Sequence, residues 1–492
     1  MQMLSPFSLW FRTPRLRRAL ALGAVVLSTG GIVLVRSSAT AQPRVFTALA
    51  DSATRTSFSG PRLSGSFALS HGKILEHGGQ VYADLTLTAD KGSGAEVRAP
   101  VSLAIVLDTS GSMSGEKIEE AKRSAIRLIR DMRAEDEVAF VRYSDGSELL
   151  QSLARVSEVR EGLIRRIEGI TANGGTNIPS GLRLGKDALR NAAGDHVHRI
   201  VLMSDGLDSS KSESDKLAAA AAAEGTVTSS LGIGLDFDES YMSSVASAGH
   251  GNFAFVKDGA SLSAFLEKEL TETSHTVVQN ANVRIRVPNG LAFVRASGAD
   301  ARMEGAELVV RAGSLFGGDE RRVLLEFRGS GSSEPCEECD NNSANFITTG
   351  ALRIPVMVDW NVVSGGAGHA EPSALTLTTT RDAEAVRQSM DPQVYSRAMS
   401  VLASRRQMEA AEAFSRGDHV RAEELSQQNN LALRAAASAL PPKMAAPLAV
   451  QADQFLEDKK EFQKGLANDG AKAASKRTMQ REFGNAYRNE WK

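Results

Sequence analysis

The chain has 492 residues, of which 42% are hydrophobic and 24% are charged, and its formal net charge is −2. This is an ordinary globular balance, and the length predicts three or four folded units. The near-neutral charge argues against nucleic acid as the partner, because such partners are held by strongly basic surfaces.

The first 41 residues have the pattern of a signal peptide. Arginines cluster between 12 and 18, a mostly apolar run covers 19–35, and Ala39-Thr-Ala41 provides a small-x-small cleavage site. The apolar run is interrupted at 28–31, so it makes a poor transmembrane span; an uncleaved anchor is the alternative. Removal of residues 1–41 takes away five Arg and no acidic residue, which changes the charge from −2 to −7. We expect an exported protein that is periplasmic, cell-surface or secreted, with no stable membrane span after cleavage.

Residues 42–98 are predicted to be a leader followed by β-strands. The segments 66–69 and 81–87 carry strand signals, the second with clean alternation of apolar and polar residues. We expect these strands to join a later β-sandwich.

Residues 99–272 alternate strand and helix patterns, which predicts an α/β domain with a doubly wound, mostly parallel sheet. The run from Val101 is almost all apolar and rich in Val, Ile and Leu, like a strand buried on both faces, and it ends in Asp108-Thr-Ser110-Gly-Ser112. Ligands of open α/β sheets bind at the carboxyl ends of the strands. A Gly-rich loop places Thr176 before a later helix, and a second buried-strand pattern ends at Asp205.

The predicted site therefore contains only oxygen ligands: two carboxylates and three hydroxyls, from Asp108, Ser110, Ser112, Thr176 and Asp205. Mg²⁺ prefers octahedral oxygen coordination and retains water when protein ligands are few. The sequence therefore predicts a divalent cation, Mg²⁺ with Mn²⁺ or Ca²⁺ as alternatives.

With these five residues in order, the segment from about 101 to 272 resembles the von Willebrand factor type A (VWA) domain, and they match its metal-ion-dependent adhesion site. The resemblance implies a Rossmann-like fold in which Ser110 and Ser112 coordinate the metal directly. It implies that Thr176 coordinates when ligand is bound, and that Asp108 and Asp205 balance charge, partly through waters. In such proteins the ligand is often a Glu or Asp carboxylate of a partner protein.

The acidic segment 236–240 follows another predicted strand, so it is expected on the same rim as the metal loops. A second cation site is one interpretation. We favour a helix N-terminus, where acidic side chains cap free N–H groups and offset the helix dipole.

Residues 276–380 change to a period of two, which predicts an antiparallel β-sandwich. The strands before residue 100 are expected to complete it, so that the α/β domain is an insertion. The only two cysteines, Cys336 and Cys339, lie in a polar loop. We predict that they form a disulfide in an oxidising compartment, with redox or metal roles as alternatives.

Residues 383–468 are predicted to be helical, with two amphipathic runs that form a hairpin and a third helix after Pro441-Pro442. Residues 469–492 are basic and are judged to have little apolar content, so we predict a solvated tail.

These patterns predict a metal-dependent protein-binding module of the adhesion type. The alternative is a structural or assembly factor that docks through its C-terminal helices, with the metal site in a regulatory role. Enzyme activity is not expected, because the metalloprotease, serine hydrolase and phosphate-loop motifs are absent from the sequence.

Overall fold

Strand β5 (Val101–Asp108), the first strand of the predicted α/β domain, is buried along its whole length. It lies in a six-stranded sheet of order β10-β9-β8-β5-β6-β7. Its neighbours β8 and β6 run parallel to it, and only the β6–β7 pair of this sheet is antiparallel. The other strands of this sheet are β6 (Glu137–Tyr143), β7 (Ser147–Arg155), β8 (Val197–Ser204), β9 (Val227–Ile233) and β10 (His250–Val256).

The computed structural model describes most of the chain after residue 53, and all of the described residues belong to one compact unit, Asp51–Lys492. The predicted signal peptide and both cysteines, Cys336 and Cys339, lie outside the described residues. The described ranges are 54–91, 99–194, 196–205, 208–256, 259–329, 350–363 and 365–488.

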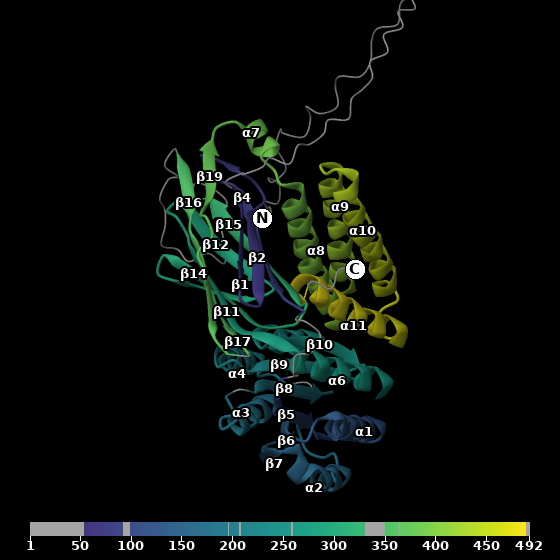
Figure 1. The fold of residues 1–492 in the computed structure, drawn as a ribbon. Helices are drawn as coiled ribbons and strands as arrows, with labels where there is room; N and C mark the ends of the chain where they lie inside the picture. Colours follow the sequence, from purple (N-terminus) through teal and green to yellow (C-terminus); the bar gives the residue numbers. More distant parts are fainter. Residues whose placement is uncertain are drawn as a thin grey trace, which may run out of the picture. The chain divides into compact units, whose positions relative to one another are not determined.

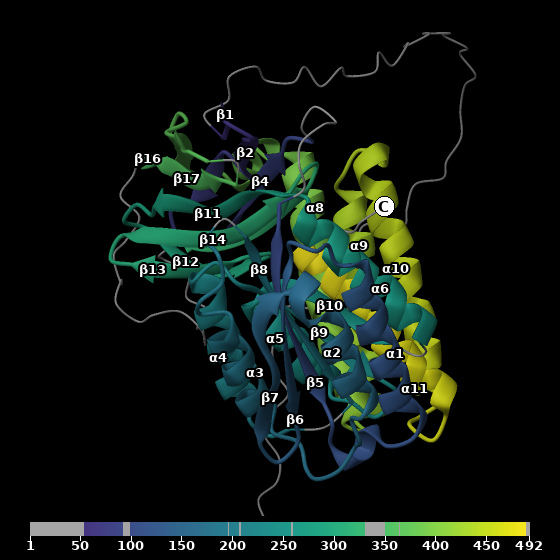
Figure 2. The same ribbon diagram turned by 60° about the horizontal axis from the view of Figure 1, so that its bottom comes forward.

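Helices cover both faces of the parallel sheet (Figure 2). Side chains of β5 alternate between two cores, because successive residues of a strand point to opposite faces. Ile105 packs with Leu128 and Leu262 on one face, while Val106 packs with Leu182 on the other. The helices are α1 (Glu116–Asp131), α2 (Val156–Glu168), α3 (Ile178–Ala188), α4 (Lys211–Ala223), α5 (Glu239–Ala248) and α6 (Gly259–Ser274), with a short 3₁₀ turn η1 (Gly111–Met113) after β5.

A β-sandwich is assembled from strands on both sides of the α/β domain in the sequence (Figure 1). Its first sheet contains β1 (Arg55–Gly60), β2 (Leu63–Leu69), β4 (Gln80–Ala89), β15 (Glu320–Gly329) and β12 (Leu291–Ser297). Its second contains β13 (Asp300–Glu304), β14 (Glu307–Phe316), β11 (Thr276–Arg286), β17 (Val356–Val362) and β18 (Ala367–Ala370). Since β4 pairs with β15, with Leu85 opposite Val323, the α/β domain is an insertion between β4 and β11.

One feature of the sandwich differs from the antiparallel prediction. A third small sheet contains β16 (Ala351–Ile354), β19 (Leu375–Thr380) and β3 (Lys73–Leu75), and its β19–β3 pair is parallel. The shared core of these sheets includes the fully buried Trp360, whose indole N–H donates to the carbonyl of Pro61 at 2.8 Å.

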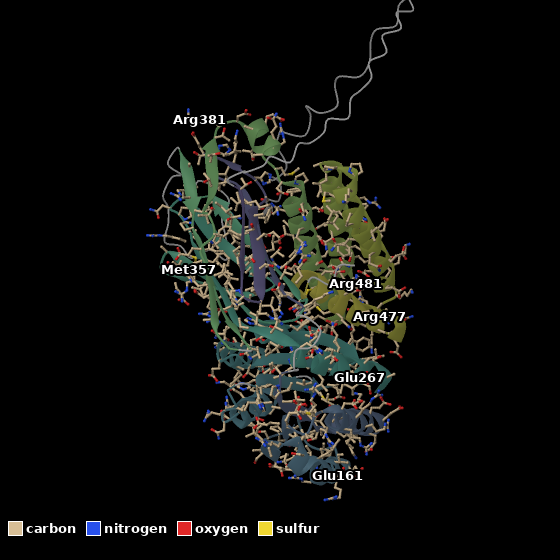
Figure 3. All side chains as sticks on the ribbon, viewed as in Figure 1. Glu161, Glu267, Met357, Arg381, Arg477 and Arg481 are labelled. Atoms are coloured by element: carbon tan, nitrogen blue, oxygen red, sulfur yellow. The ribbon has the colours of Figure 1, made fainter. Side chains whose placement is uncertain are left out.

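The C-terminal region is helical and continues further than the sequence predicted. The helices are α7 (Ala383–Gln388), α8 (Pro392–Ser415), α9 (His419–Ser438), α10 (Pro442–Phe462) and α11 (Asp469–Phe483), followed by a π-helical turn η2 (Gly484–Arg488). The predicted solvated tail is therefore wrong over most of its length. Arg477 and Arg481 of α11 are labelled in Figure 3. Arg481 pairs with the buried carboxylates of Asp458 and Glu482, both at 2.6 Å.

Helix α11 docks on the α/β domain through a buried ion pair. The Lys476 ammonium lies 2.8 Å from Glu239 Oε2, donates to the carbonyl of Phe237 at 2.8 Å, and sits 4.1 Å from the Phe237 ring centroid. The two charged side chains are only 5% and 2% exposed. Two charges removed from water in this way must stay paired, so the ion pair fixes the position of α11.

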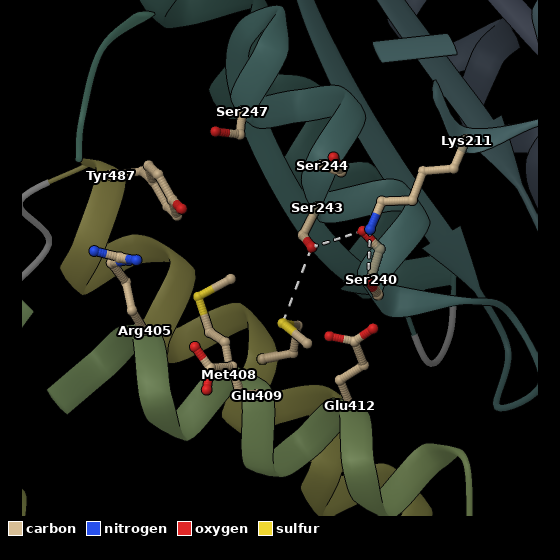
Figure 4. A pocket seen from close by; sticks show the side chains of 11 residues that line it. Lys211, Ser240, Ser243, Ser244, Ser247, Arg405, Met408, Glu409, Glu412 and Tyr487 are labelled. Atoms are coloured by element: carbon tan, nitrogen blue, oxygen red, sulfur yellow. Dashed lines mark hydrogen bonds between the residues drawn. The ribbon is translucent and has the colours of Figure 1, made fainter. Parts of the chain in front are cut away.

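A hollow of about 260 Å³ lies between α5 and α8 (Figure 4). Its α5 wall contains Ser240, Ser243, Ser244 and Ser247, and its α8 wall contains Arg405, Met408, Glu409 and Glu412. Arg405 also pairs with Glu326 of β15 at 2.6 Å, so α8 is tied to the sandwich as well. Among the described residues, no helix has both the length and the apolar character to span a membrane.

Replacement of Lys476 tests the docking of α11. We expect Lys476→Ala to destabilise the full chain by about 3 kcal/mol, because Glu239 is left charged and buried. Lys464→Ala is the matched control: its ion pair with Glu461 is exposed, and its loss should cost less than about 0.5 kcal/mol. Urea unfolding measures both, and equal effects of the two variants would contradict the assignment. A Lys476→Met, Glu239→Leu double variant should recover most of the lost stability.

Candidate metal centre

Asp108 ends β5 and is completely buried at the carboxyl edge of the parallel sheet. Its Oδ1 accepts from the backbone N–H of Ser110 at 2.8 Å, and its Oδ2 accepts from the Ser204 hydroxyl at 2.7 Å. Ser204 ends β8, which runs parallel to β5 with Leu107 opposite Met203. The register of these two strands therefore brings their polar ends together.

A continuous series of hydrogen bonds connects four of the five predicted ligands. The hydroxyls of Ser110 and Ser112 lie 3.0 Å apart, and the Ser112 hydroxyl donates to Asp205 Oδ1 at 2.8 Å. Asp108 joins the series through its bond with the backbone of Ser110. Asp108, Ser110 and Asp205 are buried, whereas Ser112 is exposed, so the series reaches the surface at Ser112.

The loop that carries Thr176 is held against the Asp108 loop. The N–H of Gly111 donates to the carbonyl of Gly174 at 2.9 Å, and the N–H of Gly175 donates to Asp145 Oδ1 at 2.9 Å. Gly174 has φ +78°, a conformation that favours glycine, and a Cβ at Gly174 or Gly175 would lie within 2.7 Å of the Asp145 carboxylate and displace it. Thr176 itself is partly buried and lines a polar hollow of about 450 Å³ beside the site.

Three further polar residues shape this edge and were not predicted from the sequence. Asp145 positions the Gly-rich loop, and Asp208 Oδ2 accepts from the N–H of Ile178 at 2.8 Å at the start of α3. Lys117, in the first turn of α1, pairs its ammonium with Asp205 Oδ2. Asp145 lies just beyond the end of β6, so the rule that ligands gather at strand ends could have identified it.

Burial governs the electrostatics of Asp108. It raises the pKa of the Asp108 carboxyl, the hydrogen bonds from Ser204 and Ser110 oppose this shift, and the nearby negative charge of Asp205 reinforces it. Two carboxylates at one edge repel each other, and a cation close to both would relieve that repulsion.

The donor set fits a hard divalent cation. Two adjacent oxygen ligands of an octahedral Mg²⁺ lie about 3 Å apart, which is the separation of the Ser110 and Ser112 hydroxyls, 3.0 Å. The Lys117 ammonium at Asp205 acts as a stand-in cation and shows that the site accepts positive charge. Over the described ranges, no group of three or more His, Cys, Asp or Glu is placed to hold a metal. A cation here would therefore rely on hydroxyl ligands.

The acidic segment 236–240 forms a helix N-terminus, as favoured above. Asp238 Oδ1 accepts from the N–H of Tyr241 at 2.9 Å, which caps α5. Glu239 is engaged by Lys476 of α11. Asp238 and Glu239 thus have structural partners, as a helix N-terminus requires.

The sequence model of the von Willebrand factor type A domain matches residues 102–268. These residues form the α/β domain described above, so the chain contains a VWA domain. An uncharacterized protein of Synechocystis sp., sll0103, is 25% identical over 252 residues, which cover 48% of this chain and 59% of that protein. Inter-alpha-trypsin inhibitor heavy chain H3 of Rattus norvegicus is 24% identical over 250 residues, 47% of this chain and 27% of that protein. The chain thus spans less than two thirds of the length of these relatives.

Two solved structures share a larger part of the fold. A von Willebrand factor type A structure from Catenulispora acidiphila has a TM-score of 0.62 at 16% identity, covering 88% of this chain and 99% of that one. The ArnB paralog VWA2 from Sulfolobus acidocaldarius has a TM-score of 0.55 at 15% identity, covering 86% and 99%. Both alignments extend well beyond the VWA segment, so the likeness of fold includes parts of the flanking domains.

The Asp108→Asn variant should stabilise the metal-free protein at neutral pH. Burial raises the folded-state pKa of Asp108 above its unfolded value, so the folded state favours the protonated, neutral form. Protonated Asp108 therefore stabilises the fold at pH values below the pKa of this carboxyl in the unfolded chain. This stabilisation is lost as the pH rises through the pKa of the same carboxyl in the folded protein. With chelator at pH 7 we expect a higher melting temperature than wild type, and the difference should narrow toward pH 4. A variant that melts at or below wild type at pH 7 would contradict this account.

Proposed function

We propose that the protein is a metal-dependent protein-binding module of the adhesion type, and that it captures a Glu or Asp carboxylate of a partner protein through a divalent cation, Mg²⁺ before Mn²⁺ or Ca²⁺. The observation that supports this proposal best is the hydrogen-bonded series from Asp108 through Ser110 and Ser112 to Asp205 at the carboxyl edge of the VWA sheet.

Each residue has a distinct role in this proposal. The hydroxyls of Ser110 and Ser112 hold the cation directly, and Thr176 adds a third hydroxyl from the loop that Gly174 ties to the site. Asp108 and Asp205 balance its charge from buried positions. When bound, the cation supplies an open coordination position for an anionic oxygen. Neutral hydroxyl ligands leave the cation short of negative charge, which favours a carboxylate as that ligand.

We propose binding rather than catalysis as the task of this edge. Hydrolysis at a metal needs a general base beside an activated water. Both oxygens of Asp108 already accept hydrogen bonds, and Asp205 accepts from Ser112 and Lys117, so these carboxylates are engaged as acceptors. The signal-peptide pattern of residues 1–41 leads us to place this module in an exported protein.

Calorimetry of the full chain tests the metal site. We expect wild type to bind Mg²⁺ or Mn²⁺, and Asp108→Asn and Ser112→Ala to bind at least about tenfold more weakly, because each removes a charge or a ligand from the site. Asp187→Ala, at an exposed pair with Arg190, is the control and should bind like wild type. The titration is repeated with acetate as a surrogate carboxylate, and absence of binding under both conditions would refute the metal site.

A second candidate function is docking through the C-terminal helices, with the metal site regulatory. Val420 and Leu431 of α9 are 69% and 57% exposed. They lie three helical turns apart, and therefore on one face of the helix. Val450 of α10 is also exposed, and exposed apolar side chains of this kind are candidates for partner contacts. Val420 borders a groove with Glu423, Glu424, Gln427, Gln428 and Lys459.

Point variants separate these two functions more cleanly than deletion of the helices, because α11 is part of the buried interface with the VWA domain. The first proposal predicts that Val420→Ser with Leu431→Ser leaves Mg²⁺-dependent capture of envelope proteins unchanged, whereas Asp108→Asn abolishes it. The second predicts that Val420→Ser with Leu431→Ser abolishes capture, and that Asp108→Asn changes only the dependence of capture on Mg²⁺. Capture is measured by mass spectrometry with Mg²⁺ and with chelator.

A further inference from the structure

The Lys117 ammonium contacts two residues of the candidate metal centre, Asp205 and Ser112. It pairs with Asp205 Oδ2, and Oδ1 of the same carboxylate accepts from the Ser112 hydroxyl at 2.8 Å. It also approaches the carbonyl of Ser112 at 3.4 Å. The Asp205 side chain is fully buried, whereas that of Lys117 is 30% exposed. The buried carboxylate thus has a cationic partner that can still reach solvent.

The backbone around Lys117 leaves room for this position. Gly234, at the end of β9, has φ +84°, and a Cβ there would lie 3.0 Å from Lys117 Cε and 3.4 Å from its Nζ. The absence of a side chain at Gly234 therefore lets the lysine stem lie against the backbone. Lys117 is also the second residue of α1, so its side chain projects from the first turn of the helix, next to the N-cap residue Gly115.

We propose that Lys117 is a built-in counter-ion of the site, and that its ammonium and the divalent cation exchange at Asp205. This inference rests on the proposed metal-dependent function and adds a means of regulation to it. The Lys117 ammonium and the divalent cation would use the same carboxylate, that of Asp205, which accepts hydrogen bonds from Ser112 and Lys117 in this structure. A divalent ion at Ser110 and Ser112 places like charge next to the ammonium, and like charges a few Å apart repel strongly where water is excluded.

The exchange has a direct consequence for affinity. Metal binding must release Lys117 from Asp205. The free energy of metal binding is therefore less favourable by the free energy of the Lys117–Asp205 ion pair, and the measured affinity is lower. In the metal-free protein the ammonium keeps a buried carboxylate paired, which avoids the cost of an isolated buried charge. Lys117 therefore favours the metal-free state until a partner's carboxylate adds negative charge to the site.

Calorimetry of the full chain with Mg²⁺ and Mn²⁺ tests the exchange. We expect Lys117→Met to bind about tenfold more tightly than wild type, because a neutral side chain of similar length cannot compete for Asp205. Lys117→Arg keeps the charge and should stay near the wild-type affinity. Lys117→Gln serves as a second neutral variant, and melting temperatures with chelator verify that each variant is folded.

The outcomes separate this inference from the proposed function. Tighter binding by both neutral variants supports the exchange, as does binding by these variants alone. Equal or weaker binding by the neutral variants, with wild type binding normally, overturns the exchange and leaves the metal site intact. Absence of binding in wild type and every variant, with and without acetate, overturns both.

A second measurement uses the wild-type chain without substitution. Pulsed acetylation followed by mass spectrometry reports how freely each lysine amine reacts. We expect saturating Mg²⁺ to raise the rate at Lys117 several-fold, because release from Asp205 exposes the amine. Lys122 on the same helix, buried and bonded to Glu119 and to the carbonyl of Ile170, is the internal control and should not change. An unchanged rate at Lys117 under metal saturation overturns the exchange.

Discussion

A carboxylate that ends a fully buried strand must find its hydrogen-bond partners at the edge of the sheet, and Asp108 imposes this requirement on the VWA domain. The Ser110 backbone, in the loop after β5, and the Ser204 hydroxyl, at the end of β8, provide these hydrogen bonds. Because Ser204 ends the neighbouring parallel strand, the requirement also fixes where Asp205 lies. The geometry of the candidate metal centre thus follows from the satisfaction of one buried group.

Positive charge at this edge is supplied from within the chain. Lys117 pairs with Asp205, and Lys476 of α11 pairs with Glu239 after the following strand, β9. The loop between β9 and α5 contacts both lysines, since Gly234 lies under the Lys117 stem and Phe237 lies under the Lys476 ammonium. This short loop therefore contacts the candidate metal centre through Gly234 and the C-terminal helices through Phe237.

The sequence was informative where a pattern was local and periodic. The buried runs ending at Asp108 and Asp205 placed two carboxylates at one sheet edge, and alternation in 81–87 and after 276 predicted strands that pair across the insertion. Lys117 was missed because a lysine in the first turn of a helix has no pattern of its own; only the fold brings it to Asp205. Helix α11 was missed because its buried residues are mostly small or polar, such as Ala474 and Lys476, so it has little amphipathic contrast.

The insertion of the VWA domain also determines the order in which the protein can be built. Strand β4 emerges from the ribosome long before β15, since the whole VWA domain is synthesised between Leu85 and its partner Val323. Until then, β1, β2 and β4 present an unpaired edge of the kind that recruits other chains. Pairings so distant in sequence form slowly. The first three strands therefore stay open to other chains until the VWA domain and β15 have been synthesised, which exposes this sheet to aggregation during biosynthesis.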